Sequence, residues 1–187
     1  RISRELWYHL VTNLKLKFVI NKSVYGQLRN NNKVFKLTEE IVEEESFSPK
    51  FVYSHLVIPH HPYYFDKNGN PAPLDKLKEF SGANKKDYVE YLQYANSKLL
   101  NLVDHIKKKS AQPPIIILMG DHGFRQFNDS VSKKYHFMNL SSFSIPNGDY
   151  TRFYDSSSSV NQIRTFLNTQ FNQQLPLLKD STVFIQQ

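Results

Sequence analysis

A continuous apolar run, Ile115–Met119, most narrowly limits what this chain can fold into. Apolar residues without alternation are typical of a strand that is covered on both faces, as in parallel sheets. The run follows a segment with helical periodicity, Asp87–Lys109, which itself follows a shorter apolar run, Phe51–Ile58. A strand, a helix and a strand in this order predict a right-handed parallel crossover. We therefore expect an α/β fold with a mostly parallel sheet flanked by helices.

Apolar residues recur every three or four positions in several segments, which predicts amphipathic helices. These segments are Arg4–Val19, Val34–Glu45, Asp87–Lys109 and Val160–Phe171, the last with Ser158 or Ser159 available as its N-cap. The polar run Asn30–Asn32 indicates a break before the second helix, and Phe137–Ile145 is a candidate for one further strand. The stretch from Pro59 to Ala83 is rich in Pro, Gly, Asn and aromatic residues, which predicts a long loop with a functional role.

Charge and residue usage exclude several classes of protein. Lys and Arg number 24 against 17 Asp and Glu, a net charge of +7. The basic residues are scattered and do not alternate with aromatic residues as in a groove for single strands, so we expect no nucleic-acid partner. The absence of Cys excludes disulfides, thiolate metal sites and a Cys nucleophile. No apolar run approaches the roughly 20 residues that a membrane-spanning helix needs.

The apolar run at Ile115–Met119 ends in Gly-Asp-His-Gly, so that Asp121 and His122 leave the strand end together. A carboxylate and an imidazole can share one divalent cation, and the flanking glycines let backbone and substrate approach closely. The same residues have a structural interpretation, in which Asp121 caps a turn and His122 is a buried, hydrogen-bonded side chain. This short pattern alone leaves both interpretations open.

Three histidines, His55, His60 and His61, lie in or just after the run Phe51–Ile58. Imidazoles there can bind a metal, donate to an anionic oxygen, or protonate a leaving group near neutral pH. They can equally satisfy loop carbonyls while the loop packs over a sheet. We expect His55, inside the predicted strand, to be structural, which leaves His60 and His61 as the candidates for chemistry.

Four segments together resemble the sulfatase-like hydrolase/transferase family of bacterial envelope proteins, within the alkaline phosphatase superfamily. They are the His-Pro-Tyr loop, Tyr-Leu-x-Tyr-x-Asn-x-Lys-Leu-Leu, Pro-Pro-Ile-Ile-Ile-x-x-Gly-Asp-His-Gly and Ser-Ser-Val-Asn-x-Ile-Arg-x-Phe-Leu-Asn, spread from Pro49 to Asn172. Lipoteichoic acid synthases and phosphoethanolamine transferases are more distant relatives of that family. The resemblance implies a partial alkaline phosphatase-like sandwich and an anionic phosphate- or sulfate-ester substrate. It also implies a place on the periplasmic or cell-surface side of the bacterial membrane, with a membrane anchor upstream of this chain.

The resemblance also implies roles for individual residues. Asp121 and His122 match the metal-binding pair of the family, which would hold Zn, Mn, Mg or Ca. His60 matches the histidine that contacts the phosphate or sulfate oxygens, and His61 is the second candidate for that catalytic role. Arg164 is a candidate for substrate binding, although its helix motif is also consistent with a structural role. His136 lies where some transferase relatives place an extra metal-binding histidine.

The chain departs from the family pattern in having no candidate nucleophile before Phe51, because Thr12 and Thr38 fall inside predicted helices. We therefore expect the C-terminal portion of one larger catalytic domain, which binds metal weakly and has no turnover alone. In this interpretation residues 1–48 are a helical lead-in, 49–172 the family-like core and 173–187 a tail. The alternative is a non-catalytic binding or scaffold module of the same fold, which holds an anionic glycan or a partner.

Overall fold

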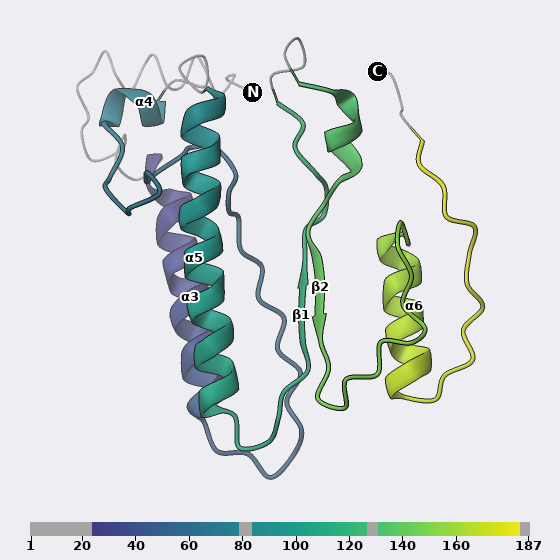
Figure 1. Cartoon of the computed structure of the whole chain (residues 1–187). Coiled ribbons are helices and arrows are strands. Elements are labelled where there is room, and N and C mark those ends of the chain that lie inside the picture. The colour runs from purple at the N-terminus through teal and green to yellow at the C-terminus, as the bar shows by residue number, and fades with distance from the viewer. Residues whose placement is uncertain (1–23, 79–83, 127–130, 184–187) are drawn as a thin grey trace, which may run out of the picture. The chain divides into compact units, whose positions relative to one another are not determined.

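The computed structural model describes residues 24–78, 84–126 and 131–183 (Figure 1). The chain divides into two compact units, Arg1–Ala111 and Gln112–Gln187. The predicted helix Arg4–Val19 lies outside the described residues. Among the helices that are described, none is long and apolar enough to cross a membrane.

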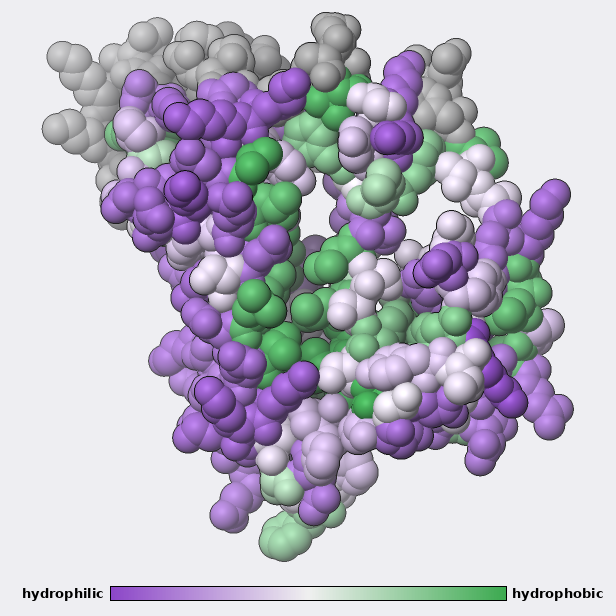
Figure 2. All heavy atoms as spheres, in the orientation of Figure 1, coloured by the Kyte–Doolittle hydropathy of each residue, from purple (hydrophilic) through white to green (hydrophobic). Residues whose placement is uncertain are grey.

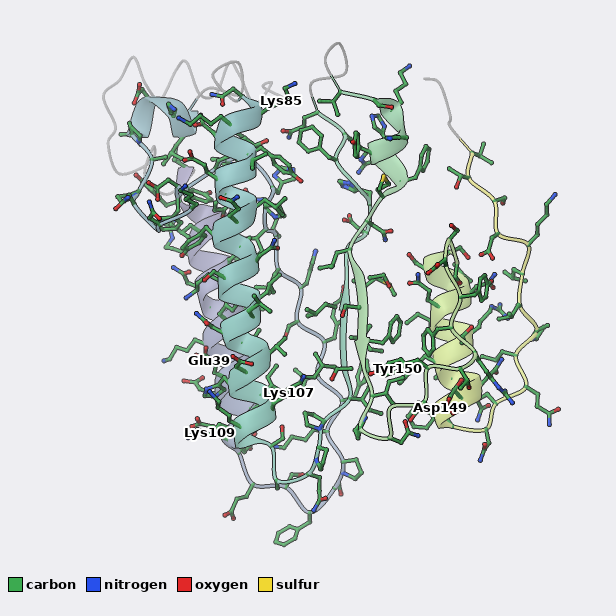
Figure 3. All side chains as sticks on the ribbon, viewed as in Figure 1. Glu39, Lys85, Lys107, Lys109, Asp149 and Tyr150 are labelled. Atoms are coloured by element: carbon green, nitrogen blue, oxygen red, sulfur yellow. The ribbon has the colours of Figure 1, made fainter. Side chains whose placement is uncertain are left out.

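Two long helices, α3 (Gly26–Glu43) and α5 (Lys85–Lys109), pack against each other in the first unit. The predicted helix Asp87–Lys109 is thus confirmed, with its lysines in the last turn, where the helix dipole favours cations (Figure 3). Glu43 at the end of α3 lies 3.3 Å from His105 Nε2 and 3.4 Å from Lys109 Nζ of α5. Hydrophilic side chains cover much of the visible outer surface of this pair (Figure 2).

The segment Phe51–Ile58 forms no strand, so that prediction is wrong, and so is the helix break at Asn30–Asn32, because α3 runs through it. One contact accounts for both errors. The Asn31 side chain donates to the Val57 carbonyl oxygen at 3.0 Å and accepts from the Val57 N–H at 2.8 Å. Asn31 is buried, and its amide thereby supplies the two hydrogen bonds that a neighbouring strand would have made. A second contact attaches the same segment to α3 further along the helix: the Thr38 and Ser54 hydroxyls lie 2.6 Å apart.

Aromatic side chains form the core of the first unit and fix the loop that follows Ile58. Tyr63, Tyr64 and Tyr91 are buried, and the Tyr64 hydroxyl donates to the Val24 carbonyl oxygen at 2.7 Å. Burial raises the pKa of Tyr91. The described part of the predicted loop, residues 59–78, is largely irregular as expected, apart from one short helix, α4 (Leu74–Lys78), whose Leu77 joins the same core.

The second unit contains a small antiparallel sheet. Strand β1 (Ile116–Met119) pairs with β2 (Ser141–Ser144), with Ile116 opposite Ser144 and Met119 opposite Ser141. A short 3₁₀ helix, η2 (Lys133–Phe137), precedes β2. The strand at Ile115–Met119 is confirmed, and the fold is a mixture of helices and strands. The expected mostly parallel sheet is not found among the described residues, in part because Phe51–Ile58 is bound to a helix instead of to a strand.

The last helix, α6 (Ser159–Gln170), is confirmed with Ser158 as its N-cap. The chain after α6 returns along it and is held by two asparagines. Asn161, fully buried, pairs with both backbone groups of Leu178, and Asn168 pairs with both backbone groups of Leu175. Asp180 completes the attachment by accepting from the Tyr154 hydroxyl at 2.6 Å and the Ser158 N–H at 2.8 Å. These hydrogen bonds lower the pKa of Asp180 to about 2.

The pairing of Asn31 with Val57 predicts an asymmetric response within the run Asn30–Asn32. Asn31→Ala leaves two partly buried backbone groups unpaired, which costs about 2 kcal/mol of stability after the better helix propensity of Ala is counted. Asn32→Ala is the matched control, because Asn32 is exposed in the same helix and should gain a few tenths of a kcal/mol from propensity. Urea unfolding of both variants measures the difference, and equal midpoints would contradict the role given to Asn31.

Candidate functional site

Asp121 and His122 leave the end of β1 with their side chains directed toward each other. His122 Nε2 lies 3.7 Å from Asp121 Oδ2, and the two side chains are 37% and 90% exposed. His122 Nδ1 lies 2.6 Å from the Gly123 carbonyl oxygen, which can only accept a hydrogen bond. Nδ1 therefore donates to this carbonyl, and Nε2 is the ring atom that faces the Asp121 carboxylate.

This geometry fits half of a divalent-cation site. Two donor atoms bound to one zinc at tetrahedral angles are about 3.4 Å apart, close to the 3.7 Å between His122 Nε2 and Asp121 Oδ2. The hydrogen bond from Nδ1 to a backbone carbonyl is the outer contact that orients a ligating histidine. Within the described ranges no three His, Cys, Asp or Glu side chains form a metal-binding group.

The glycines on either side of the pair let the backbone pack closely. The Gly120 N–H donates to the Leu140 carbonyl oxygen at 2.9 Å, and the Gly123 N–H donates to the His136 carbonyl oxygen at 2.9 Å. A Cβ atom at Gly123 would lie 1.9 Å from the Tyr135 carbonyl oxygen, which no side chain tolerates. Gly123 is thus required where the backbone of η2 packs against the turn that carries Asp121 and His122, which we call the Asp-His turn. The close approach that the glycines were expected to allow is made here by backbone.

His136 contributes its backbone to this contact. Its carbonyl oxygen accepts from Gly123, while its half-buried ring lies 6.4 Å from the Phe137 ring, centre to centre. The described residues do not bring Asp121, His122 and His136 together as a three-ligand group. A metal-binding role for His136 stays a prediction.

The loop that carries His60 and His61 lies in the first unit. His60 is exposed, and its Nδ1 lies 3.4 Å from Gln27 Nε2 and within hydrogen-bonding distance of the His61 carbonyl oxygen. His61 packs edge-on against Tyr63, with ring centres 5.3 Å apart. His55 is exposed and stacks on Tyr53, and its structural role stays a prediction.

His61 also lines a hollow of about 250 Å³ between the loop and the start of α5. The cationic and anionic side chains around it are Lys76, Lys86, Asp66, Asp87 and Glu90. Lys76 binds Asp87 at 3.0 Å, so one pair of these charges is already neutralised. The sequence pattern did not single out these residues. The Lys76–Asp87 pair joins two helices, α4 and α5, and belongs to no periodic motif.

A tight turn, Asp66–Asn70, contributes to the lining of this hollow. Asp66 accepts from the Asn68 and Asn70 N–H groups, both at 2.9 Å, and from the Asn70 side chain at 2.8 Å. The Asn70 side chain and these N–H groups lower the pKa of Asp66. Gly69 adopts φ +83°, a left-handed conformation that favours glycine. Asp66 therefore organises the turn with its own carboxylate.

Arg164 lies on α6 and donates to the Pro176 carbonyl oxygen at 2.9 Å. It thus helps to hold the chain that returns along the helix, next to Asn161 and Asn168. Asn161 has the structural role that the helix motif indicates. Contact of Arg164 with a substrate stays a prediction.

Gly123→Ala is expected to disrupt the turn that carries Asp121 and His122, because the new Cβ collides with the backbone of η2. Forcing backbone apart in this way costs about 1–3 kcal/mol. Gly26→Ala is the control, since a Cβ there meets nothing within 4 Å. Thermal unfolding should show a lower midpoint for Gly123→Ala and an unchanged or raised one for Gly26→Ala; a neutral Gly123→Ala would show that η2 does not pack on this turn.

Comparison with models of protein families, with curated proteins and with solved structures finds no match to this chain. Two local arrangements in the structure have the side chains for chemistry. One is the Asp121–His122 pair with its oriented ring, and the other is the histidine loop with the hollow beside His61. The first of these has the more specific chemistry, because His122 Nε2 and Asp121 Oδ2 lie 3.7 Å apart and the imidazole is held by the Gly123 carbonyl oxygen.

Proposed function

We propose that this chain is the C-terminal portion of a metal-dependent, sulfatase-like hydrolase or transferase domain that acts on phosphate or sulfate esters of the bacterial cell envelope. The observation that supports the proposal is the Asp121–His122 pair. Its two donor atoms lie 3.7 Å apart, and the imidazole is oriented by Gly123, so the pair is prepared to share one divalent cation.

In this proposal the bound cation polarises the ester and stabilises a hydroxyl nucleophile supplied by another part of the domain. Asp121 and His122 supply two of its ligands from this chain. His60 or His61 contacts the transferred group and holds or delivers a proton at the leaving oxygen. His60 is exposed and so is accessible to an ester, whereas His61 faces a hollow that is able to receive part of the substrate.

The same proposal requires the two histidine-bearing segments to meet. We propose that the ends of the segment Phe51–Ile58 and of β1 lie next to each other in the complete domain. Their sequence supports this, because each is a short apolar run that ends a few residues before the candidate side chains.

The metal-binding part of the proposal predicts weak binding of Zn²⁺ or Mn²⁺ to the 187-residue chain, measured by calorimetry. Asp121→Ala should weaken this binding by at least tenfold, because one of two ligands is lost. Asp104→Ala, an exposed carboxylate on α5, is the matched control and should have no effect. Binding should also weaken in acid, because both ligands must be deprotonated.

The chain alone should not hydrolyse a phosphodiester or an aryl sulfate, since it lacks the nucleophile. Cation binding that is absent, or that Asp121→Ala leaves unchanged, would remove the catalytic proposal and favour a scaffold module. Binding of an anionic glycan without a cation would then be the property to measure for that alternative.

A further inference from the structure

An exposed group of apolar side chains lies at η2 and the residues that lead into β2. Tyr135, Phe137, Met138 and Leu140 are 41%, 45%, 62% and 50% exposed. We call these four residues, together with Lys133 and Lys134, the η2 patch. A few single exposed apolar residues are ordinary on a protein surface, but four within six consecutive positions are more than that and indicate a binding surface.

The η2 patch has a fixed position at one end of the β1–β2 sheet. The Leu140 carbonyl oxygen accepts from Gly120 at 2.9 Å, and the His136 carbonyl oxygen accepts from Gly123 at 2.9 Å. Met119, the last residue of β1 and 37% exposed, pairs with Ser141 beside it and extends the apolar surface. The patch is therefore attached through two backbone contacts on either side of the Asp-His turn.

Two lysines directly precede these apolar side chains in the chain. Lys133 and Lys134 are exposed, and Lys134 Nζ lies 5.2 Å from the centre of the Tyr135 ring. No acidic residue occurs between positions 131 and 148 of the sequence, and the whole chain has a net charge of +7. Asp121 is the exposed acidic group on the turn that supports η2. The patch thus combines positive charge with aromatic, thioether and aliphatic surface.

We propose that the η2 patch binds an anionic lipid surface. Tyrosine rings are favoured at the level of lipid headgroups, while Phe, Met and Leu side chains enter the boundary of the acyl chains. Lysines on flexible stems then reach the phosphate groups of anionic lipids. Protein interfaces are depleted in lysine at their centre, and nucleic-acid grooves stack bases on aromatic rings without a use for Met or Leu. Lipid is therefore the occupant that matches all six side chains.

The test is sedimentation of the 187-residue chain with vesicles that contain equal amounts of phosphatidylglycerol and phosphatidylcholine, at low salt. The chain should bind these vesicles and bind pure phosphatidylcholine vesicles much less. Lys133→Ala with Lys134→Ala should weaken binding about 30-fold, since each lysine near an anionic surface changes affinity about fivefold. The control is Lys107→Ala with Lys108→Ala at the end of α5 (Figure 3), which removes the same charge elsewhere and should weaken binding far less.

Insertion of the apolar side chains has its own readout. In a Trp7→Phe background, Phe137→Trp should show a blue-shifted emission when phosphatidylglycerol vesicles are added, whereas Leu100→Trp, which replaces a side chain 64% exposed on α5, should not. The proposal is overturned if the chain does not bind these vesicles, if both lysine pairs matter equally, or if the emission of Phe137→Trp does not shift. Binding of a single-stranded oligonucleotide through the same lysines, without binding of vesicles, would overturn it in favour of nucleic acid. None of these measurements depends on the proposed metal chemistry.

Discussion

The structure depends on asparagine side chains that take the place of strand neighbours. An amide side chain carries an NH2 donor group beside a carbonyl acceptor, so it can pair with both the C=O and the N–H of one residue. Asn31 does so for Val57, Asn161 for Leu178 and Asn168 for Leu175. Each pairing fixes a segment of irregular chain along a helix, where backbone groups would otherwise lose water without gaining a partner.

This device explains which elements the sequence predicted and which it did not. The helices α5 and α6 have long periodic patterns, and their caps at Asn84 and Ser158 are local, so periodicity was sufficient to find them. Phe51–Ile58 has the composition of a strand, but its pairing is decided by a distant side chain in α3. Asn30–Asn32 has the composition of a break, yet the central residue gains its partner from that same segment. Local patterns do not contain such long-range contacts.

The candidate site was predictable to a similar extent. Asp121 and His122 are adjacent in the chain, so their proximity follows from the sequence, and their orientation follows from the hydrogen bond of His122 to Gly123. The need for Gly123 was visible as a motif, although the backbone of η2 that requires it was not. The hollow beside His61 is formed by α4, α5 and a turn at Asp66, and no spacing in the sequence brings those charged residues together.

The returning chain beside α6 has a consequence for how this protein tolerates changes in length. Asn161 and Asn168 are seven residues apart, which is about 10.5 Å along a helix, and their partners Leu178 and Leu175 are three residues apart, which is about 10 Å of extended chain. The spacing of the two asparagines on the helix matches the spacing of the two leucines in the extended chain only in this register. Surface segments without regular structure ordinarily accept an added or deleted residue. Between Leu175 and Leu178 a single deletion would displace one asparagine from its partner, so the spacing there is as restricted as it is inside a helix.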